Sequence, residues 1–135
     1  MALQSWRRPK TLTNPMAVKR LEEKYGFTVS EELSECILLH NGARPKPNTI
    51  TLKNGEENDV KILLSYNEND PENIYGIIEY FIENYKGKLI PFAADSAGNY
   101  YCELEKCIVL WTQSKEIFPV CNNFSQFLES LYEIE

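Results

Sequence analysis

The chain has 135 residues, 43% of them hydrophobic, which is enough for one core and too little for two well-formed domains. No stretch approaches the roughly 20 apolar residues of a membrane span, and the opening segment lacks the apolar run of a secretory signal. We therefore expect a cytoplasmic protein. The net charge of −6 combines a basic stretch over residues 1–24 with an acidic remainder of eighteen Asp and Glu against eight Lys and Arg. The acidic part of the chain after residue 24 argues against a nucleic-acid partner. It favours a basic protein partner, or it simply keeps the chain soluble.

The first 13 residues show no hydrophobic periodicity, and Trp6 is their only strong apolar anchor. We expect residues 1–13 to be a flexible arm and residues 14–135 to be the folded domain. Asn14 followed by Pro15 is a common helix start, and the helix predicted there ends at Gly26.

A second helix is predicted to begin near Thr28, through a capping box, or near Ser30. The Asn41-Gly42 pair is expected to end it, and a loop stiffened by prolines follows. The residues expected to face inward are Leu33, Ile37 and Leu38.

Residues 49–52 and 60–64 are predicted to form a hairpin around the turn at Asn54-Gly55. Asp70 and Pro71 then open the clearest helix of the sequence, which runs to Tyr85. The hairpin is inferred from its turn, whereas the helix is inferred from a stripe of Ile and Phe at helical spacing.

Four short strands are predicted in the second half, separated by polar clusters and arranged as an antiparallel meander. They cover residues 88–94, 99–104, 107–112 and 116–120. A last helix begins at Asn122 or Asn123. These elements predict a single α+β domain in which helices cover one side of a curved antiparallel sheet.

Material for enzymatic chemistry is sparse. The only histidine, His40, shares a helix face with Cys36, but no third group supports a catalytic dyad. A small hydrolase that uses Cys36 or Cys102 is the remaining enzymatic alternative. No phosphate-binding glycine motif is present. We therefore expect no enzyme and no cofactor.

The four cysteines do not have the spacing of a metal site, because no two of them stand two to four residues apart. We expect no metal. A tight turn at Leu104-Glu105 is predicted to place Cys102 and Cys107 opposite each other across a hairpin. Sparse cysteines within apolar segments are typical of buried, reduced thiols.

The outer face of the helix predicted at 70–85 alternates acidic and aromatic residues. Tyrosine offers contact area at low entropic cost, and carboxylates attract a basic partner, so this face is the candidate partner-binding site. The alternative is a solvated face on which the tyrosines lie flat. Glu79 and Glu83 repel each other at i, i+4, a cost that an interface would explain. The candidate residues are Glu72, Tyr75, Glu79, Tyr80 and Glu83.

Several segments match one family pattern when taken together. In the first half they are LEEKYG at 21–26, VSEEL at 29–33 and HNG at 40–42. In the second half they are LIPFAADSAGNYYC at 89–102, IVLW at 108–111 and FSQFL at 124–128. Over most of its length the chain resembles the SUKH superfamily. Ser30 stands where that family prefers proline, and Thr112-Gln113 replaces an Asp-His pair.

The resemblance implies a bacterial immunity protein that binds and neutralises a cognate polymorphic toxin, often a nuclease. Such a role needs no catalytic residue. The expected partner is a toxin domain of basic charge, with neither nucleic acid nor membrane involved, and the oligomeric state stays open. The superfamily also implies an alternative, an intracellular scaffold or regulator linked to cell-wall synthesis.

Overall fold

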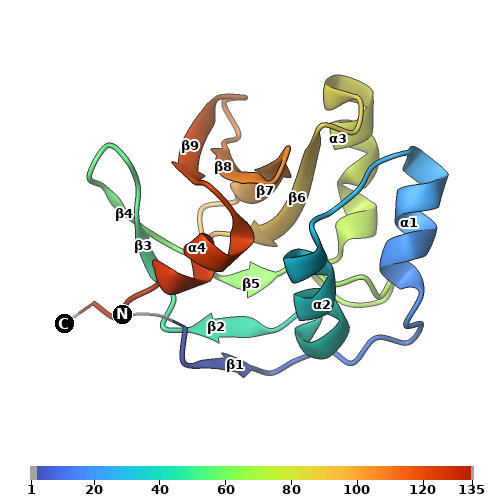
Figure 1. Cartoon of the computed structure of the whole chain (residues 1–135), viewed down its shortest axis with the longest axis horizontal. Coiled ribbons are helices and arrows are strands. Elements are labelled where there is room, and N and C mark those ends of the chain that lie inside the picture. Colours follow the sequence, from blue (N-terminus) through green and yellow to red (C-terminus); the bar gives the residue numbers. More distant parts are fainter. Residues whose placement is uncertain (1–2, 135) are drawn as a thin grey trace.

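The structure is a computed structural model that describes residues 3–134, and Figure 1 shows its helices arranged around antiparallel strands. In chain order the described elements are β1 (Ser5–Arg7), α1 (Ala17–Tyr25), α2 (Glu31–His40), β2 (Arg44–Lys46), β3 (Thr49–Thr51), β4 (Glu57–Asp59), β5 (Ile62–Leu63), the 3-10 helix η1 (Ile74–Gly76), α3 (Ile78–Tyr85), β6 (Leu89–Ala94), β7 (Tyr100–Leu104), β8 (Cys107–Trp111), β9 (Ile117–Cys121) and α4 (Phe124–Glu129). The largest sheet has the strand order β5-β6-β7-β8-β9, while β1 pairs with β2 and β3 with β4. The α+β class, the single domain and the meander are confirmed.

Both faces of the five-stranded sheet are covered by helices. On one face, Phe92 and Tyr101 pack against Phe127 of α4, with ring centroids 5.3 and 5.2 Å apart. On the other face, Trp111 packs 5.1 Å from Phe81 of α3. All six residues of β6 are consequently buried. The prediction that helices lie on one side only is wrong for α3, because alternate strand residues point to opposite faces and both faces here are apolar.

The first two helices lie close to their predicted positions. Gly26 ends α1 with a left-handed φ of 74°, and the side chain of Ser30 caps α2 by accepting a hydrogen bond from Leu33 N. Ser30 was the second of the two predicted starts. Leu38, which was predicted to face inward, is instead 52% exposed, because the core side of α2 is occupied by Leu33 and Ile37.

The predicted hairpin has a different second strand. Its turn is confirmed, since Leu52 N donates to Glu56 O at 2.8 Å. However, β3 pairs with β4, and Ile62 and Leu63 pair with β6 in the large sheet. The apolar residues of β5 are therefore buried in the sheet, whereas the polar β4 completes the hairpin.

The helix predicted from Asp70 to Tyr85 begins only at Ile78. Asp70 does not cap it, because its carboxylate accepts hydrogen bonds from Ser65 Oγ at 2.5 Å and Asn67 Nδ2 at 3.0 Å. Asn73 caps the 3-10 helix η1 instead. The side chains that signalled a helix start thus fasten a loop.

The predicted arm is joined to the domain by hydrogen bonds over its described part; its residues 1–2 lie outside the described residues. Strand β1 pairs antiparallel with β2. Asn41 Nδ2 donates to Lys10 O at 2.8 Å, and Asn67 Nδ2 donates to Thr11 O at 2.9 Å. Both asparagines are buried. Backbone pairing and side-chain amides produce no hydrophobic period, which explains why the pattern suggested a loose segment.

Candidate partner-binding site

Three of the five predicted interface residues lie on α3. Glu79 and Glu83 are exposed one turn apart, and neither has a cationic partner within 4 Å among the described residues. Tyr80 is half-buried: its ring packs 5.7 Å from that of Trp111, and its hydroxyl accepts a hydrogen bond from Lys115 Nζ at 2.8 Å. The tyrosine therefore lies against the sheet, while the two carboxylates project freely. A binding role for them stays a prediction.

The other two predicted residues precede α3 and face other surroundings. Glu72 pairs with Lys61 at 2.9 Å and lines a cavity of about 310 Å³. Tyr75 lies in η1, donates a hydrogen bond to Tyr66 O at 2.9 Å and lines a separate cavity of about 540 Å³. Burial raises the pKa of the Tyr75 hydroxyl. The five residues therefore do not form one helix face.

A groove between α1 and α2 contains exposed apolar side chains, which the predicted face on α3 lacks. Its volume is about 460 Å³, and its apolar part includes Met16 and Leu38, which are 50% and 52% exposed. Large side chains exposed to this extent at the mouth of a groove are typical of docking surfaces. The groove is lined by Leu12, Pro15, Met16, Val18, Lys19, Glu22, Glu31, Ser34, Glu35 and Leu38.

The rim of this α1–α2 groove is acidic. Glu22 Oε2 accepts a hydrogen bond from Val29 N at 2.9 Å and so fastens the connection between the two helices. Glu31 and Glu35 stand one turn apart on α2, exposed and without an ion-pair partner in the described part of the chain. An apolar floor beside unpaired carboxylates suits a partner that presents apolar and basic side chains.

The sequence contains a signal for the groove that our prediction did not use. Ile37, Leu38 and Leu39 are consecutive, and successive helix residues point about 100° apart, so one face cannot bury all three. The structure buries Ile37 and leaves Leu38 and Leu39 exposed. A run of three large apolar residues on a short helix therefore indicates that at least one of them faces outward.

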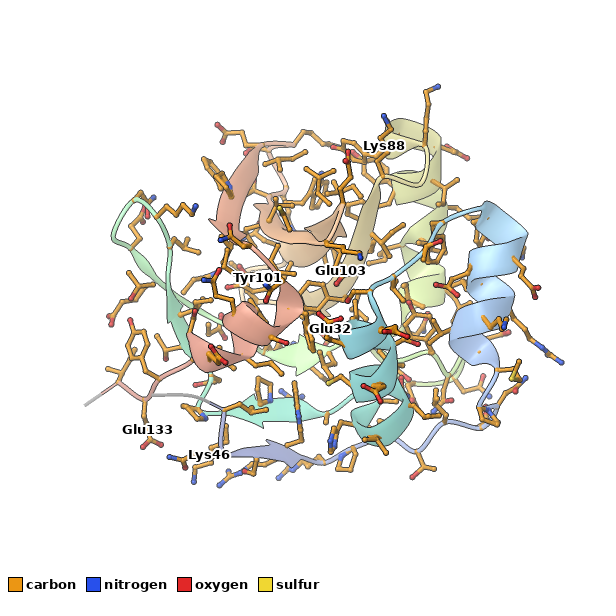
Figure 2. The ribbon with its side chains drawn as sticks, in the orientation of Figure 1. Glu32, Lys46, Lys88, Tyr101, Glu103 and Glu133 are labelled. Atoms are coloured by element: carbon orange, nitrogen blue, oxygen red, sulfur yellow. The ribbon has the colours of Figure 1, made fainter. Side chains whose placement is uncertain are left out.

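A buried carboxylate positions the start of α2. Glu103 of β7 accepts hydrogen bonds from Ser30 N at 2.9 Å and from Ser30 Oγ at 2.6 Å. Figure 2 shows Glu103 on the side of β7 that faces the beginning of α2. Burial raises the pKa of this carboxyl, and the hydrogen bonds from Ser30 lower it in part. The central sheet thereby fixes the helix that forms one wall of the groove.

The thiol environments do not favour nucleophilic chemistry. Burial raises the pKa of Cys36 to about 12 and that of Cys102 well above its ordinary value, so both thiols keep their protons at neutral pH. His40 stacks on Trp6 with ring centroids 5.7 Å apart, and no hydrogen bond joins it to Cys36 among the described contacts.

The strand register separates the two cysteines that were predicted to face each other. Cys102 lies opposite Val109, and Cys107 lies opposite Leu104. The two-residue turn falls at Glu105 and Lys106 rather than at 104–105, and all four cysteines are free. Cys102 is buried and Cys107 is exposed, so a disulfide between them is not supported.

The segment 95–99 is a structural turn. Asp95 is buried and accepts hydrogen bonds from Ala97 N and Asn99 N at 2.9 and 2.8 Å. Among residues 3–134, no group of three or more His, Cys, Asp or Glu is placed to hold a metal ion. Nor does any helix in this range combine the length and the apolar character needed to cross a membrane.

The fold and the groove define a class of protein: an α+β domain with helices on both faces of a five-stranded antiparallel sheet and an open, acid-rimmed groove. The chain belongs to the SMI1 / KNR4 family (SUKH-1), whose family model matches residues 13–130. This match confirms the resemblance to the SUKH superfamily and extends from α1 to α4. Searches among curated proteins and among solved structures found no significant match.

Proposed function

We propose that the protein is an immunity protein that binds a cognate polymorphic toxin domain, such as a nuclease, and neutralises it by covering the toxin's active surface. Membership of the SUKH-1 family is consistent with this role. The observation that carries the proposal is the α1–α2 groove, in which exposed Met16 and Leu38 lie beside the unpaired carboxylates of Glu31 and Glu35. Neutralisation by contact requires no catalytic group in this chain.

A basic toxin surface would use both features of the groove. Long-range attraction to the carboxylates raises the association rate, and burial of Leu38 and Met16 slows dissociation. A nuclease domain carries basic side chains for its nucleic-acid substrate, so the same cations suit an acidic inhibitor. A cytoplasmic location is part of the proposal and agrees with four free cysteines.

Two acidic surfaces compete for the role of contact site. One is the α1–α2 groove, and the other is the pair Glu79 and Glu83 on α3. The groove adds apolar area to its charges, whereas the nearest aromatic residue of the α3 pair, Tyr80, is held against Trp111 and Lys115. We therefore propose the groove as the principal contact and the α3 pair as a secondary one.

The test begins with the toxin itself. A tagged copy is purified from the native cell, and a stoichiometric partner is compared with the product of the gene immediately upstream. The toxin domain is then expressed with and without this chain. Rescue of growth together with a one-to-one complex on size-exclusion chromatography with light scattering is the expected result.

Matched variants separate the two surfaces. Glu31→Lys with Glu35→Lys changes the groove, and Glu79→Lys with Glu83→Lys makes the same charge change on α3; circular dichroism verifies that each variant is folded. Loss of rescue by the first pair alone supports the groove, and loss by the second alone moves the contact to α3. Several substoichiometric envelope partners, with no toxin to neutralise, would overturn the proposal and favour a scaffold linked to cell-wall synthesis.

A further inference from the structure

The two-stranded ribbon formed by β1 and β2 is basic although the protein as a whole is acidic. Arg7, Arg8 and Arg44 are exposed and Lys46 is half-buried. None of the four has a carboxylate within 4 Å among the described residues, where the ion pair found is Lys61–Glu72. Figure 2 shows Lys46 at the edge of the molecule, directed away from the body. The ribbon therefore presents positive charge that the protein does not neutralise.

The register of the ribbon makes this charge costly to keep. Arg7 lies directly opposite Arg44, and Ser5 lies opposite Lys46. Like charges in directly opposed positions of an antiparallel pair destabilise it. A carboxylate at either arginine position would instead stabilise the pairing. The two arginines therefore lower the stability of the ribbon relative to an oppositely charged pair.

A cavity of about 310 Å³ opens beside the ribbon and continues its charge. Its charged wall residues are the cations Arg8, Lys10, Arg44 and Lys61 and the carboxylates Asp70 and Glu72. Asp70 accepts hydrogen bonds from Ser65 and Asn67, and Glu72 pairs with Lys61. Two local features admit these side chains: Arg8 has a left-handed φ of 51°, and Gly42 leaves room for Lys10, whose Cγ would lie 2.8 Å from a Cβ at that position. Arg8 is thus held in a conformation that residues other than glycine rarely adopt.

One acceptor in the cavity wall also has no partner. Glu72 Oε1 accepts from Lys61 Nζ at 2.9 Å, but Oε2 is buried and has no hydrogen-bond partner among the described residues. A buried acceptor left in this state costs free energy until a donor reaches it. The wall cations without a carboxylate partner within 4 Å among the described residues are Arg8, Lys10 and Arg44, and they favour an occupant with negative charge.

We propose that the β1–β2 ribbon and its cavity bind an acidic, extended segment of a partner protein, at a surface distinct from the toxin-binding groove. An extended peptide supplies carboxylates at every second residue and backbone N–H groups between them. The length of the ribbon matches a few residues of such a segment. One acidic side chain enters the cavity.

A nucleic acid fits the same surface less well. The ribbon is only three residue pairs long, which is short for a surface that follows a phosphate backbone. The one aromatic ring on the ribbon, Trp6, is stacked on His40 and packed against the core, so it is not free to stack on a base.

The test uses the full chain and fluorescence anisotropy at low ionic strength. The probe is a labelled octapeptide of alternating Glu and Ser, and its Gln-Ser counterpart serves as the uncharged control. Arg44→Glu is the test variant, because it removes charge from the ribbon and creates an attractive pair with Arg7. Lys88→Glu makes the same change of net charge at the opposite side of the molecule, as Figure 2 shows.

We expect the acidic peptide to bind and the Gln-Ser peptide not to bind. Arg44→Glu should weaken binding by about tenfold while its melting temperature stays at or above that of the unaltered protein. Lys88→Glu should change the affinity by less than about twofold. Equal losses of peptide affinity in Arg44→Glu and Lys88→Glu, or no binding of the acidic peptide, would overturn the proposal. So would tighter binding of a single-stranded oligonucleotide of equal charge, which would make the ribbon a nucleic-acid surface.

Discussion

The α1–α2 groove and the β1–β2 ribbon are both exposed surfaces, yet they combine charge and apolar area in opposite ways. The groove has an apolar floor with unpaired carboxylates at its rim, and its walls are two helices anchored in the core. The ribbon has unpaired cations; Trp6 packs against the core, and the buried Asn41 and Asn67 hydrogen-bond the segment that follows β1. A single domain can therefore present two surfaces that select partners of opposite charge.

The largest expected effect separates the groove from the rest of the surface. Leu38→Asp should weaken binding of the cognate toxin by about 100-fold, or roughly 3 kcal/mol, because it places a charge in the apolar floor. Its unfolding free energy should fall by only about 1 kcal/mol, since Leu38 is half exposed and the cost comes mainly from an acidic residue in the last turn of α2. Surface plasmon resonance measures the affinity.

The control for this variant is Ile134→Asp, which alters a similarly exposed apolar residue outside the groove. It should change the affinity by less than about twofold. If both variants bind the toxin as the unaltered protein does, the groove is not the contact site.

The next effect concerns how the ribbon is attached. Asn41→Ala should lower the unfolding free energy by about 2 kcal/mol, because Lys10 O and Tyr66 N lose their hydrogen bonds to the buried amide. Urea unfolding measures the change. Asn84→Ala removes an exposed amide that donates to Tyr80 O, and it should cost less than about 0.5 kcal/mol. Equal costs would show that the buried amide has no special role.

A smaller effect is expected from salt, which should weaken binding at the ribbon more than binding at the groove. Raising the ionic strength from about 50 to about 500 mM should weaken acidic-peptide binding at the ribbon by about tenfold, because its exposed charges are screened. The toxin complex at the groove should weaken by less than about threefold, since part of its affinity comes from apolar burial. Titrations at both salt concentrations measure this, and identical slopes would contradict the distinction.

The smallest effect is a pH dependence beneath the groove. Burial raises the folded-state pKa of Glu103 above its unfolded value, so the folded state holds this proton more tightly. The contribution to stability is complete below the unfolded pKa and is lost as the pH rises through the folded pKa. Glu103→Gln should remove this loss, so stability above the ordinary Glu pKa of 4.5 should fall less steeply with pH than in the unaltered protein. Urea unfolding from pH 4 to pH 7 tests it, and parallel profiles would exclude Glu103 as the cause.

Local signals predicted the starts of α2 and α4 and the meander well. Ser30 and Asn123 cap α2 and α4 as expected, because a side-chain oxygen near a helix start acts within three residues. Where the same residue types serve distant partners, the predictions failed. Asp70 has the identity of a helix cap, yet it bonds to Ser65 and Asn67 and η1 follows.

The candidate site was harder to predict than the fold. Exposed residues of α3 were recognised as acidic, but the position of Glu72 and Tyr75 depended on where the helix begins. The groove depends on how α1 and α2 are placed next to each other, and Glu22 and Glu103 hold the connection and the start of α2 through contacts with residues outside their own elements. The hydrophobic periodicity of the sequence does not reveal such contacts.

The sequence by itself determined the α+β class, the existence of the four helices and the four-stranded meander, because caps, turns and periodicity are properties of neighbouring residues. Its motifs also carried the resemblance to the SUKH superfamily. Only the tertiary structure decided that α3 covers the second face of the sheet, that β5 leaves the hairpin, and that residues 5–7 pair with residues 44–46. Each of these depends on which distant segment supplies the missing hydrogen bonds and apolar contacts. Which segments pair depends on how the whole chain buries its apolar residues rather than on any local pattern.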